Sequence, residues 1–313
     1  MNTDLKLPVI SSDANKYTRG SLLVLAGSRR YFGAGVLATL AAEKTGAGYV
    51  SLATPKSSAY AARQHLLCSP VIEAAEDAVL GCFTATALPD ILQEIRRINA
   101  LCAGPGLTVN DNTASFLREL LRHALQERTP LLLDADALSI LAAKPELMSR
   151  LQRERQNHEL DVEQQMQLIL TPHEGELARM HNALFPAPRF EGEAPWPATK
   201  LKVPVSQAAQ ELAMELGAVI VAKGPTTYIT SGGELVECNK ATPALAKAGT
   251  GDVLSGVISS LLAQGMRAFE AAALGVEIHS LAGVAAEQKQ GRRSVTALDV
   301  VEAIPQVVSS FEG

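Results

Sequence analysis

The stretch SLLVLAGSRRYFGAGVLATLAAEKTGAGYVSLATP, residues 21–55, decides the fold. Residues 21–28 are an apolar run that ends in a glycine turn, which is typical of a buried strand. Residues 33–48 are rich in alanine and end in glycines, as a helix does, and residues 49–55 are a second strand-like run. A strand, a helix and a strand in this order make a βαβ unit, from which parallel sheets are built.

The same alternation continues along the chain. Apolar runs that end in turns predict more strands, and the run at 218–230 leads through a glycine turn into a hairpin. We therefore predict an α/β fold in a single domain over residues 1–313, with helices on both faces of a largely parallel sheet. The other predicted strands are 99–106, 130–138 and the run that begins at 168, and the other predicted helices are 112–126, 252–264, 268–288 and 296–303.

Two stretches interrupt this alternation. Residues 150–166 are strongly polar, and residues 181–204 are rich in proline. We interpret both as surface insertions and not as domain linkers, because strands and helices alternate again after each. A solvated helix is the alternative interpretation of the first stretch.

Composition and charge exclude several classes of function. Aromatic residues make up 4% of the 313 residues, the net charge is -5 and the sequence pI is about 5.8. These values argue against a protein that stacks on single-stranded nucleic acid or binds nucleic acid or anionic membranes in general. The N-terminus has no apolar signal region, and no stretch approaches the roughly 18 apolar residues that span a bilayer. We therefore predict a cytoplasmic protein.

The four cysteines give no sign of a metal site. Cys68, Cys82, Cys102 and Cys238 have no CxxC spacing, and no histidine spacing indicates zinc. We interpret all four as reduced thiols in the core of a cytosolic protein.

Residues that can take part in chemistry follow the predicted strands. The carboxyl ends of parallel strands meet at one rim, where ligands of such folds bind. Several candidates also have a plainer interpretation. On that interpretation, residues 104–106 form only a tight turn, and Asp134 and Asp136 are helix N-caps. Similarly, His173 would be a hydrogen-bonded loop residue and Lys223 a solvated charge. The candidates are Gly27, Ser28, Gly104, Gly106, Asp134, Asp136, Thr171, Pro172, His173, Glu174, Lys223 and Gly224.

The stretch ATPALAKAGTGDVLSGVISSLLAQG, residues 241–265, joins a glycine turn to an acid. Gly249, Thr250 and Gly251 run into Asp252, and apolar residues follow at helical spacing. A helix N-terminus carries about half a positive charge and four unpaired N–H groups, so these amides can hold a phosphate. A carboxylate beside that phosphate can take the proton of an acceptor hydroxyl. The plainer alternative is a capped helix start. The stretch is not a Walker loop, because no GxxxxGK[ST] pattern is present.

The stretch AKAGTGDVLSGVISSLLAQG resembles the anion-hole motif of ribokinase-like kinases. Together with residues 20–55, the motifs AGPGL, LLLDADAL, LTPHEGELARM and VIVAKGPTTYI occur in the order and spacing of the ADP-dependent NAD(P)H-hydrate dehydratases. The resemblance covers about residues 15–305, and the motifs are highly specific as a set. It implies a ribokinase-like three-layer α/β/α fold with a largely parallel central sheet.

The resemblance also implies a repair reaction and its residues. The family converts the 6S hydrate of NADH or NADPH to NAD(P)H, using ADP and releasing AMP and phosphate. Phosphorylation of the ring hydroxyl makes a good leaving group, with Asp252 as the base and the amides of Gly249, Thr250 and Gly251 as the anion hole. The implied hydrate contacts are Ala34, Gly106, His173 and Asp252, and the implied nucleotide contacts are Lys223, Gly224, Pro225, Thr226, Thr227 and Gly251.

The expected cofactors and partners come from the same resemblance. A divalent cation, expected to be magnesium, bridges phosphates, and the sequence does not identify its ligands. The family implies a homo-oligomer, often a tetramer, and an epimerase that is here a separate protein. The sequence does not decide between ADP and ATP, or between the hydrates of NADH and NADPH.

Three departures from the family pattern bear on the site. Glu174 stands where the family often has proline, which puts the turn that carries His173 in doubt. Lys247 adds a positive charge in the loop before the glycine turn, and Ser139 replaces an asparagine. None of these removes the proposed base.

Two other functions fit parts of the pattern. A small-molecule kinase of the same superfamily, for hydroxymethylpyrimidine or hydroxyethylthiazole, shares the GTGD turn but leaves a stable phosphorylated product. A non-catalytic nucleotide sensor binds without turnover. The stretches GSRRYFGAG and TPHEGE favour the dehydratase.

Overall fold

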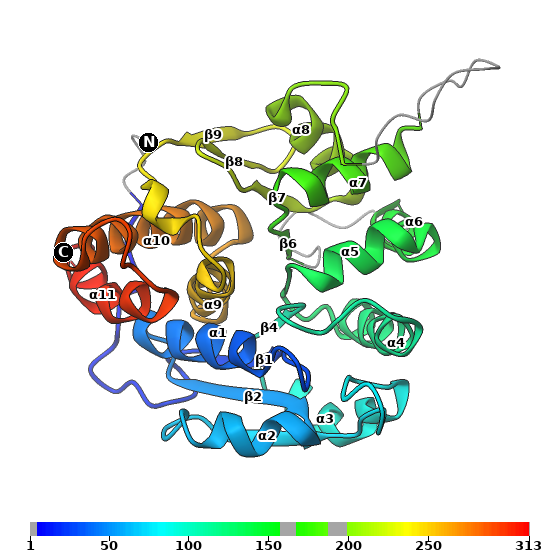
Figure 1. Ribbon diagram of the computed structural model, residues 1–313, viewed down its shortest axis with the longest axis horizontal. Coiled ribbons are helices and arrows are strands. Elements are labelled where there is room, and N and C mark those ends of the chain that lie inside the picture. Colours follow the sequence, from blue (N-terminus) through cyan, green and yellow to red (C-terminus); the bar gives the residue numbers. More distant parts are fainter. Residues whose placement is uncertain (1–4, 157–166, 187–198, 313) are drawn as a thin grey trace.

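A nine-stranded sheet forms the centre of the molecule in the computed structural model, which describes residues 5–156, 167–186 and 199–312. The strand order is β3-β2-β1-β4-β5-β6-β7-β8-β9 (Figure 1). Strands β1 to β7 pair in parallel, and β8 and β9 add an antiparallel hairpin at one edge. The strands are β1 Ser21–Leu25, β2 Tyr49–Pro55, β3 Val71–Ala74, β4 Ala100–Ala103, β5 Leu131–Leu133, β6 Leu168–Leu170, β7 Val219–Ala222, β8 Thr227–Thr230 and β9 Leu235–Cys238.

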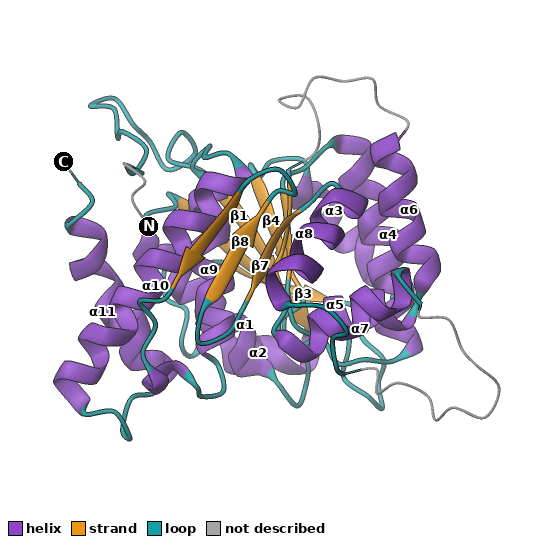
Figure 2. Cartoon of the chain, turned by 90° about the horizontal axis from the view of Figure 1, so that it is seen from above, coloured by secondary structure: helices purple, strands orange, loops and turns teal. Residues whose placement is uncertain are grey.

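Helices cover both faces of this sheet, so the predicted three-layer α/β/α architecture is confirmed. Figure 1 shows α9, α10 and α11 on one side of the strands and α4 to α7 on the other, and Figure 2 shows the same layers from above. The helices are α1 Phe32–Thr45, α2 Lys56–Arg63, α3 Leu88–Ile95, α4 Asp111–Glu127, α5 Asp136–Ala143, α6 Pro145–Gln156, α7 Glu174–Leu184, α8 Val205–Leu216, α9 Thr250–Ala263, α10 Ala268–Gln290 and α11 Ala297–Ser309.

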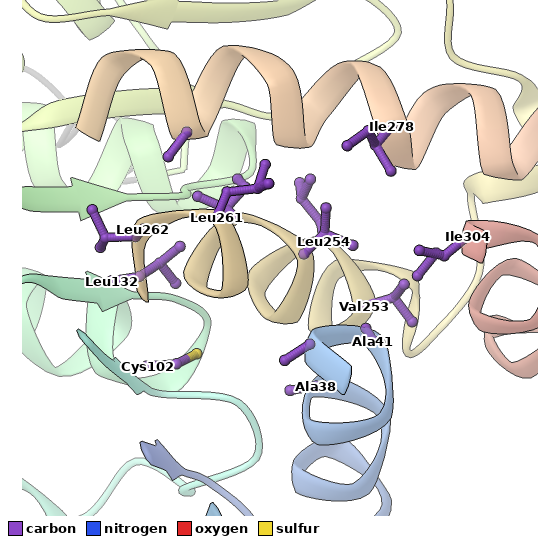
Figure 3. Close-up of a cluster of buried hydrophobic side chains, with 14 of the residues drawn as sticks. Ala38, Ala41, Cys102, Leu132, Val253, Leu254, Leu261, Leu262, Ile278 and Ile304 are labelled. Carbon is purple, nitrogen blue, oxygen red and sulfur yellow. The ribbon is translucent and has the colours of Figure 1, made fainter. Parts of the chain in front are cut away.

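Close contact between α1 and α9 explains the small residues of the first βαβ unit. A Cβ atom on Gly256 would lie 2.1 Å from the carbonyl oxygen of Ala38, so only glycine allows this approach. Figure 3 shows Ala38 and Ala41 of α1 facing α9, beneath Leu254 and below Ile278 of α10. This packing holds the N-terminus of α9 against the strand ends.

Most of the predicted elements are present, but the segment between β2 and β4 was not predicted. It contains α2, β3 and α3, and β3 is a short edge strand of four residues. Helices α5 and α8 were not predicted either, and the predicted strand 130–138 was too long, because β5 ends at Leu133 and α5 begins at Asp136. The predicted hairpin is confirmed as β8 and β9.

The two predicted insertions begin inside helices. Residues 150–156 are the end of α6, so the solvated-helix interpretation was better for this part. Residues 181–184 are the end of α7, and His181 and Met180 there are buried. The rest of both stretches lies partly outside the described residues.

The interpretation of all four cysteines as core thiols is wrong for Cys68, which is exposed. Cys82, Cys102 and Cys238 are buried and unbridged. Burial raises the pKa of the Cys102 thiol to about 12, so this thiol is protonated at neutral pH.

Helix α10 is long and apolar enough to cross a membrane by length and composition, although no such stretch was expected. In the folded chain, 67% of its most apolar window is buried. It packs against α9 and α11 in the hydrophobic core that these helices share, as a core helix of a globular fold does.

Candidate functional site

The candidate residues gather at the carboxyl rim of the sheet, as the parallel strand order requires. The loops after β1 and β4 touch, because the amide of Gly27 donates to the carbonyl oxygen of Pro105 at 2.8 Å. The loops after β6 and β7 touch in the same way, where the amide of Lys223 donates to the carbonyl oxygen of Pro172 at 2.8 Å. Neighbouring strand ends thus build one continuous surface.

The first turn of α9 presents unpaired amides at this rim. Gly249 is the N-cap, with a φ of 92° that favours glycine, and Thr250 anchors the loop by donating its hydroxyl to Leu245 and Lys247. Among the described residues, the amides of Gly251 and Asp252 have no recorded acceptor. The turn therefore has the geometry of an anion site.

The surroundings of the Asp252 carboxylate suit it to act as a base. No hydrogen bond to its carboxylate is recorded within the described residues, although the side chain is partly buried. Burial and the negative charges of Asp134 and Asp136 raise its pKa to about 7, against the opposing charge of Lys223. A carboxylate with a pKa near the working pH is suited to proton transfer.

Asp134 and Lys223 form a buried ion pair behind Asp252. The Nζ atom of Lys223 donates to Oδ1 of Asp134 at 2.7 Å, and Asp134 is 1% exposed. Burial lowers the pKa of Lys223, but Asp134, Glu176 and Asp252 outweigh it and raise the pKa overall. The interpretation of Lys223 as a solvated loop charge is therefore wrong.

His173 is the N-cap of α7. Its Nδ1 accepts hydrogen bonds from the amides of Gly175 at 3.0 Å and Glu176 at 3.3 Å. Burial and the positive charges of Lys223 and Arg179 lower the pKa of His173, which favours the neutral ring that such acceptance needs. The loop-histidine interpretation is thus correct for Nδ1, while the exposed ring is still accessible to a ligand.

Glu176 completes this cap from inside the protein. Its Oε2 accepts from the His173 amide at 2.9 Å, and its Oε1 lies 3.3 Å from Nε2 of the same ring. Burial and Asp134 raise the pKa of Glu176 to about 7, against Lys223. Glu174 is the first helical residue, a position where proline is also favoured, so its replacement of proline leaves the turn intact.

Ala34 and Gly106 lie side by side. A Cβ atom on Gly106 would be 2.9 Å from that of Ala34 and 2.8 Å from the carbonyl oxygen of Tyr31. The amide of Thr108 donates to Oδ2 of Asp136 at 2.8 Å, which ties this loop to the end of β5. Gly104 and Gly106 both have positive φ values, which agrees with the tight-turn interpretation of their backbone. Asp136 does not cap α5, whose N-cap is Ala135.

The turn from Lys223 to Thr227 connects β7 to β8. Gly224 and Pro225 are exposed, Thr226 is partly exposed, and the Thr227 hydroxyl donates to the Gly224 carbonyl at 3.3 Å. Lys247 lies on the other side of the site, where its Nζ donates to the Arg293 carbonyl at 2.7 Å.

Three polar residues of the site, Glu176, Ser255 and His279, were not identified from the sequence. The Ser255 hydroxyl donates to Asp134, as does the hydroxyl of the predicted candidate Thr171. Nε2 of His279 lies 2.9 Å from the carbonyl oxygen of Thr250. Burial lowers the pKa of His279 to about 4, so the neutral ring donates from Nε2 to the first turn of α9. A histidine inside the apolar pattern of α10 is the one signal that was available.

The described part of the chain contains no group of three His, Cys, Asp or Glu side chains arranged to hold a metal ion. Magnesium in nucleotide sites is often held by one or two carboxylates and the substrate phosphates. The residues therefore fit an ion that binds together with a nucleotide better than a resident metal.

Comparison with known proteins points to one family. A profile of the NAD(P)H-hydrate dehydratase family matches residues 22–306. A bifunctional NAD(P)H-hydrate repair enzyme of Moorella thermoacetica is 30% identical over 98% of this chain and 52% of its own length. The chain thus spans about half the length of the first such relatives. An ADP-dependent (S)-NAD(P)H-hydrate dehydratase of Cenarchaeum symbiosum is 29% identical over 98% of this chain and 94% of its own.

A solved structure supports the fold. The ADP/ATP-dependent NAD(P)H-hydrate dehydratase of Bacillus subtilis, co-crystallised with ATP and Mg²⁺, matches with a TM-score of 0.73 at 24% identity. The match covers 98% of this chain and 95% of that one. The fold is therefore ribokinase-like.

Proposed function

Because the chain belongs to the NAD(P)H-hydrate dehydratase family, we propose that it repairs the 6S hydrates of NADH and NADPH. The reaction is an ADP-dependent dehydration that releases AMP and phosphate, which makes the protein a carbon–oxygen lyase. The observation that carries the proposal is Asp252, a carboxylate with a pKa of about 7 at the open amides of α9.

Asp252 takes the proton of the ring hydroxyl, whose oxygen then bonds to the β-phosphorus of ADP while the bond to AMP breaks. The open amides of Gly251 and Asp252, with that of Gly249, stabilise the negative charge on the transferring phosphoryl group. The Thr250 amide, which was predicted to join them, donates to the Lys247 carbonyl oxygen at 3.4 Å. The lone pair of the ring nitrogen then expels phosphate, and loss of a proton from the neighbouring ring carbon restores the double bond.

Lys223 and the turn that follows it bind the nucleotide. Its ammonium group lies near the first turn of α9, because a Cβ atom on Gly251 would be 3.6 Å from Nζ. Ala34, Gly106 and His173 contact the hydrate from the opposite loops. A magnesium ion bound together with the nucleotide would neutralise part of the phosphate charge.

The remaining parts of the proposal follow from the resemblance. We place the protein in the cytoplasm as a homotetramer, with a separate epimerase that interconverts the two hydrate epimers. Bifunctional relatives are named as repair enzymes and are about twice as long as this chain.

The direct test is to mix the protein with NADH hydrate, magnesium and ADP and follow the reduced-nicotinamide absorbance. We expect a rise that needs both protein and ADP. A flat trace with ADP and with ATP would overturn the dehydratase proposal. A stable phosphorylated product from a small hydroxylated substrate would then support the kinase.

The activity should depend on pH through Asp252. The base acts in its deprotonated form, so kcat/KM should rise about tenfold per pH unit below about pH 7 and level off above it. Glu176 has a similar pKa but does not act on Asp252 directly, so Glu176→Gln should leave this acidic limb in place. If the acidic limb disappears in Glu176→Gln, the limb reports Glu176 and not Asp252.

Two substitutions separate the roles of His173. Asparagine is a good N-cap, so His173→Asn should keep the stability of α7 and raise the KM for the hydrate about tenfold. His173→Ala should raise KM similarly and also lower the free energy of unfolding by about 1 kcal/mol. An unaltered KM in His173→Asn would remove His173 from the hydrate site.

A further inference from the structure

We propose that Asp134 is a positioning residue that holds the ammonium group of Lys223 beside the phosphate-binding first turn of α9. This inference rests on the proposed function, because it assigns Lys223 a place beside the transferring phosphoryl group. The sequence placed Asp134 among the rim candidates without a specific role, with a helix N-cap as the plainer alternative, and the structure shows that Ala135 occupies that N-cap.

Asp134 is fully buried and fully hydrogen-bonded. It accepts from Lys223 at 2.7 Å, from the Thr171 hydroxyl at 2.8 Å and from the Ser255 hydroxyl at 2.7 Å. The donors come from the ends of β6 and β7 and from α9, so one carboxylate joins three elements that meet only in the folded chain. Such a network fixes the Lys223 ammonium in one place.

The same carboxylate also reaches the anion-binding turn. The Ser255 hydroxyl that contacts Asp134 lies 3.1 Å from the carbonyl oxygen of Gly251. Since Nζ of Lys223 is 3.6 Å from a Cβ position on Gly251, the cation and the turn are held together through Asp134. Loss of Asp134 would therefore free the Lys223 ammonium, while the Thr250 hydroxyl and His279 still hold the turn.

Charge explains why this position needs a carboxylate. The negative charges of Asp134, Glu176 and Asp252 all raise the pKa of Lys223, but the hydrogen bond from its Nζ goes to Asp134. Without Asp134, the free ammonium would be drawn to Asp252 and would stabilise its charged form. Asp134 also acts on Asp252 as a like charge, together with Asp136. Its removal should therefore make Asp252 a weaker base.

The test compares Asp134→Asn with a matched surface change. Asp134→Asn should lower kcat about 100-fold and move the acidic limb of kcat/KM down by about one pH unit. The control is Asp111→Asn, because Asp111 also accepts from a lysine, Lys144, at 3.0 Å but is exposed. It should change neither quantity. An acidic limb that stays where it is would overturn the proposal.

A double variant covers the case in which Asp134→Asn does not fold. Asp134→Asn combined with Lys223→Met leaves no unpaired buried charge, so it should fold. If Asp134 acts through Lys223, the double variant should have the kcat and the ADP affinity of Lys223→Met alone. If the losses of the two single variants multiply in the double variant, the proposal is overturned.

Calorimetric titration with ADP separates this inference from the proposed function. Asp134→Asn and Lys223→Met should each weaken ADP binding about tenfold, with no further loss in the double variant. If the wild type fails to restore NADH but shows this binding pattern, the function fails and the positioning role stands. Wild-type ADP affinity in folded Asp134→Asn would overturn the positioning role whatever the activity.

Discussion

Asp252→Asn is expected to slow turnover about 10³-fold while ADP affinity stays nearly unchanged. The substitution keeps the size and the polarity of the side chain but removes its ability to take a proton. The amides of the first turn of α9 belong to the backbone, and Lys223 keeps its bond to Asp134, so the nucleotide contacts persist. The measurement is kcat with NADH hydrate and ADP, together with an ADP titration.

Asp111→Asn is the control for this change as well. Asp111 is also an acid in the first turn of a helix, α4, but it is exposed and is paired with Lys144. Its replacement should leave kcat within about twofold of wild type. An Asp252→Asn variant with the wild-type rate would remove Asp252 from the role of base. A variant that has lost ADP binding would show that the carboxylate supports the turn instead.

Gly104→Ala is expected to destabilise the protein by about 3–5 kcal/mol. The φ of Gly104 is 132°, and an added Cβ atom would lie 1.9 Å from the carbonyl oxygen of Asp134. Neither backbone can move freely, because the Gly104 amide bonds to Leu25 and the Asp134 amide bonds to Ala103. The strain therefore falls on the end of β5, where Asp134 holds Lys223.

Urea unfolding followed by circular dichroism measures this loss. Gly233→Ala is the matched control, because a Cβ atom at Gly233 meets no atom within 4 Å and its φ lies outside the left-handed region. The control should change the free energy of unfolding by no more than about 0.5 kcal/mol. Equal stability of the two variants would show that the rim is less tightly packed than the structure indicates.

Much of the fold follows from local sequence patterns. The apolar runs, glycine turns and helical periodicity of residues 21–55 predict a βαβ unit, and the observed β1, α1 and β2 confirm it. The elements that were not predicted are α2, β3, α3, α5 and α8. Strand β3 has four residues and α2, α3 and α5 have eight each, so each is too short to show a clear periodic pattern. The boundaries of the two insertions failed for a related reason. Polar composition marks a solvated surface, but it does not distinguish a loop from the exposed end of a helix such as α6.

The position of the candidate site was also predictable, because parallel strands must end at one rim. Gly249 to Asp252, Lys223 and His173 were placed there by that argument alone. Their partners were not predictable. Asp134 meets Lys223 across 89 positions of sequence and Ser255 across 121, and His279 meets Thr250 across 29. No local pattern encodes such pairs.

The sequence by itself determined the alternation of strands and helices that makes a parallel sheet, the glycine turn that opens α9 and the acid that follows it. Only the tertiary structure decided which of the rim acids is free and which is bound. Asp134 and Asp252 are both carboxylates at helix starts or strand ends, but one is fully hydrogen-bonded and the other has a pKa of about 7. The physical reason is that hydrogen bonding and desolvation depend on residues distant in sequence, whereas secondary structure depends mainly on neighbours.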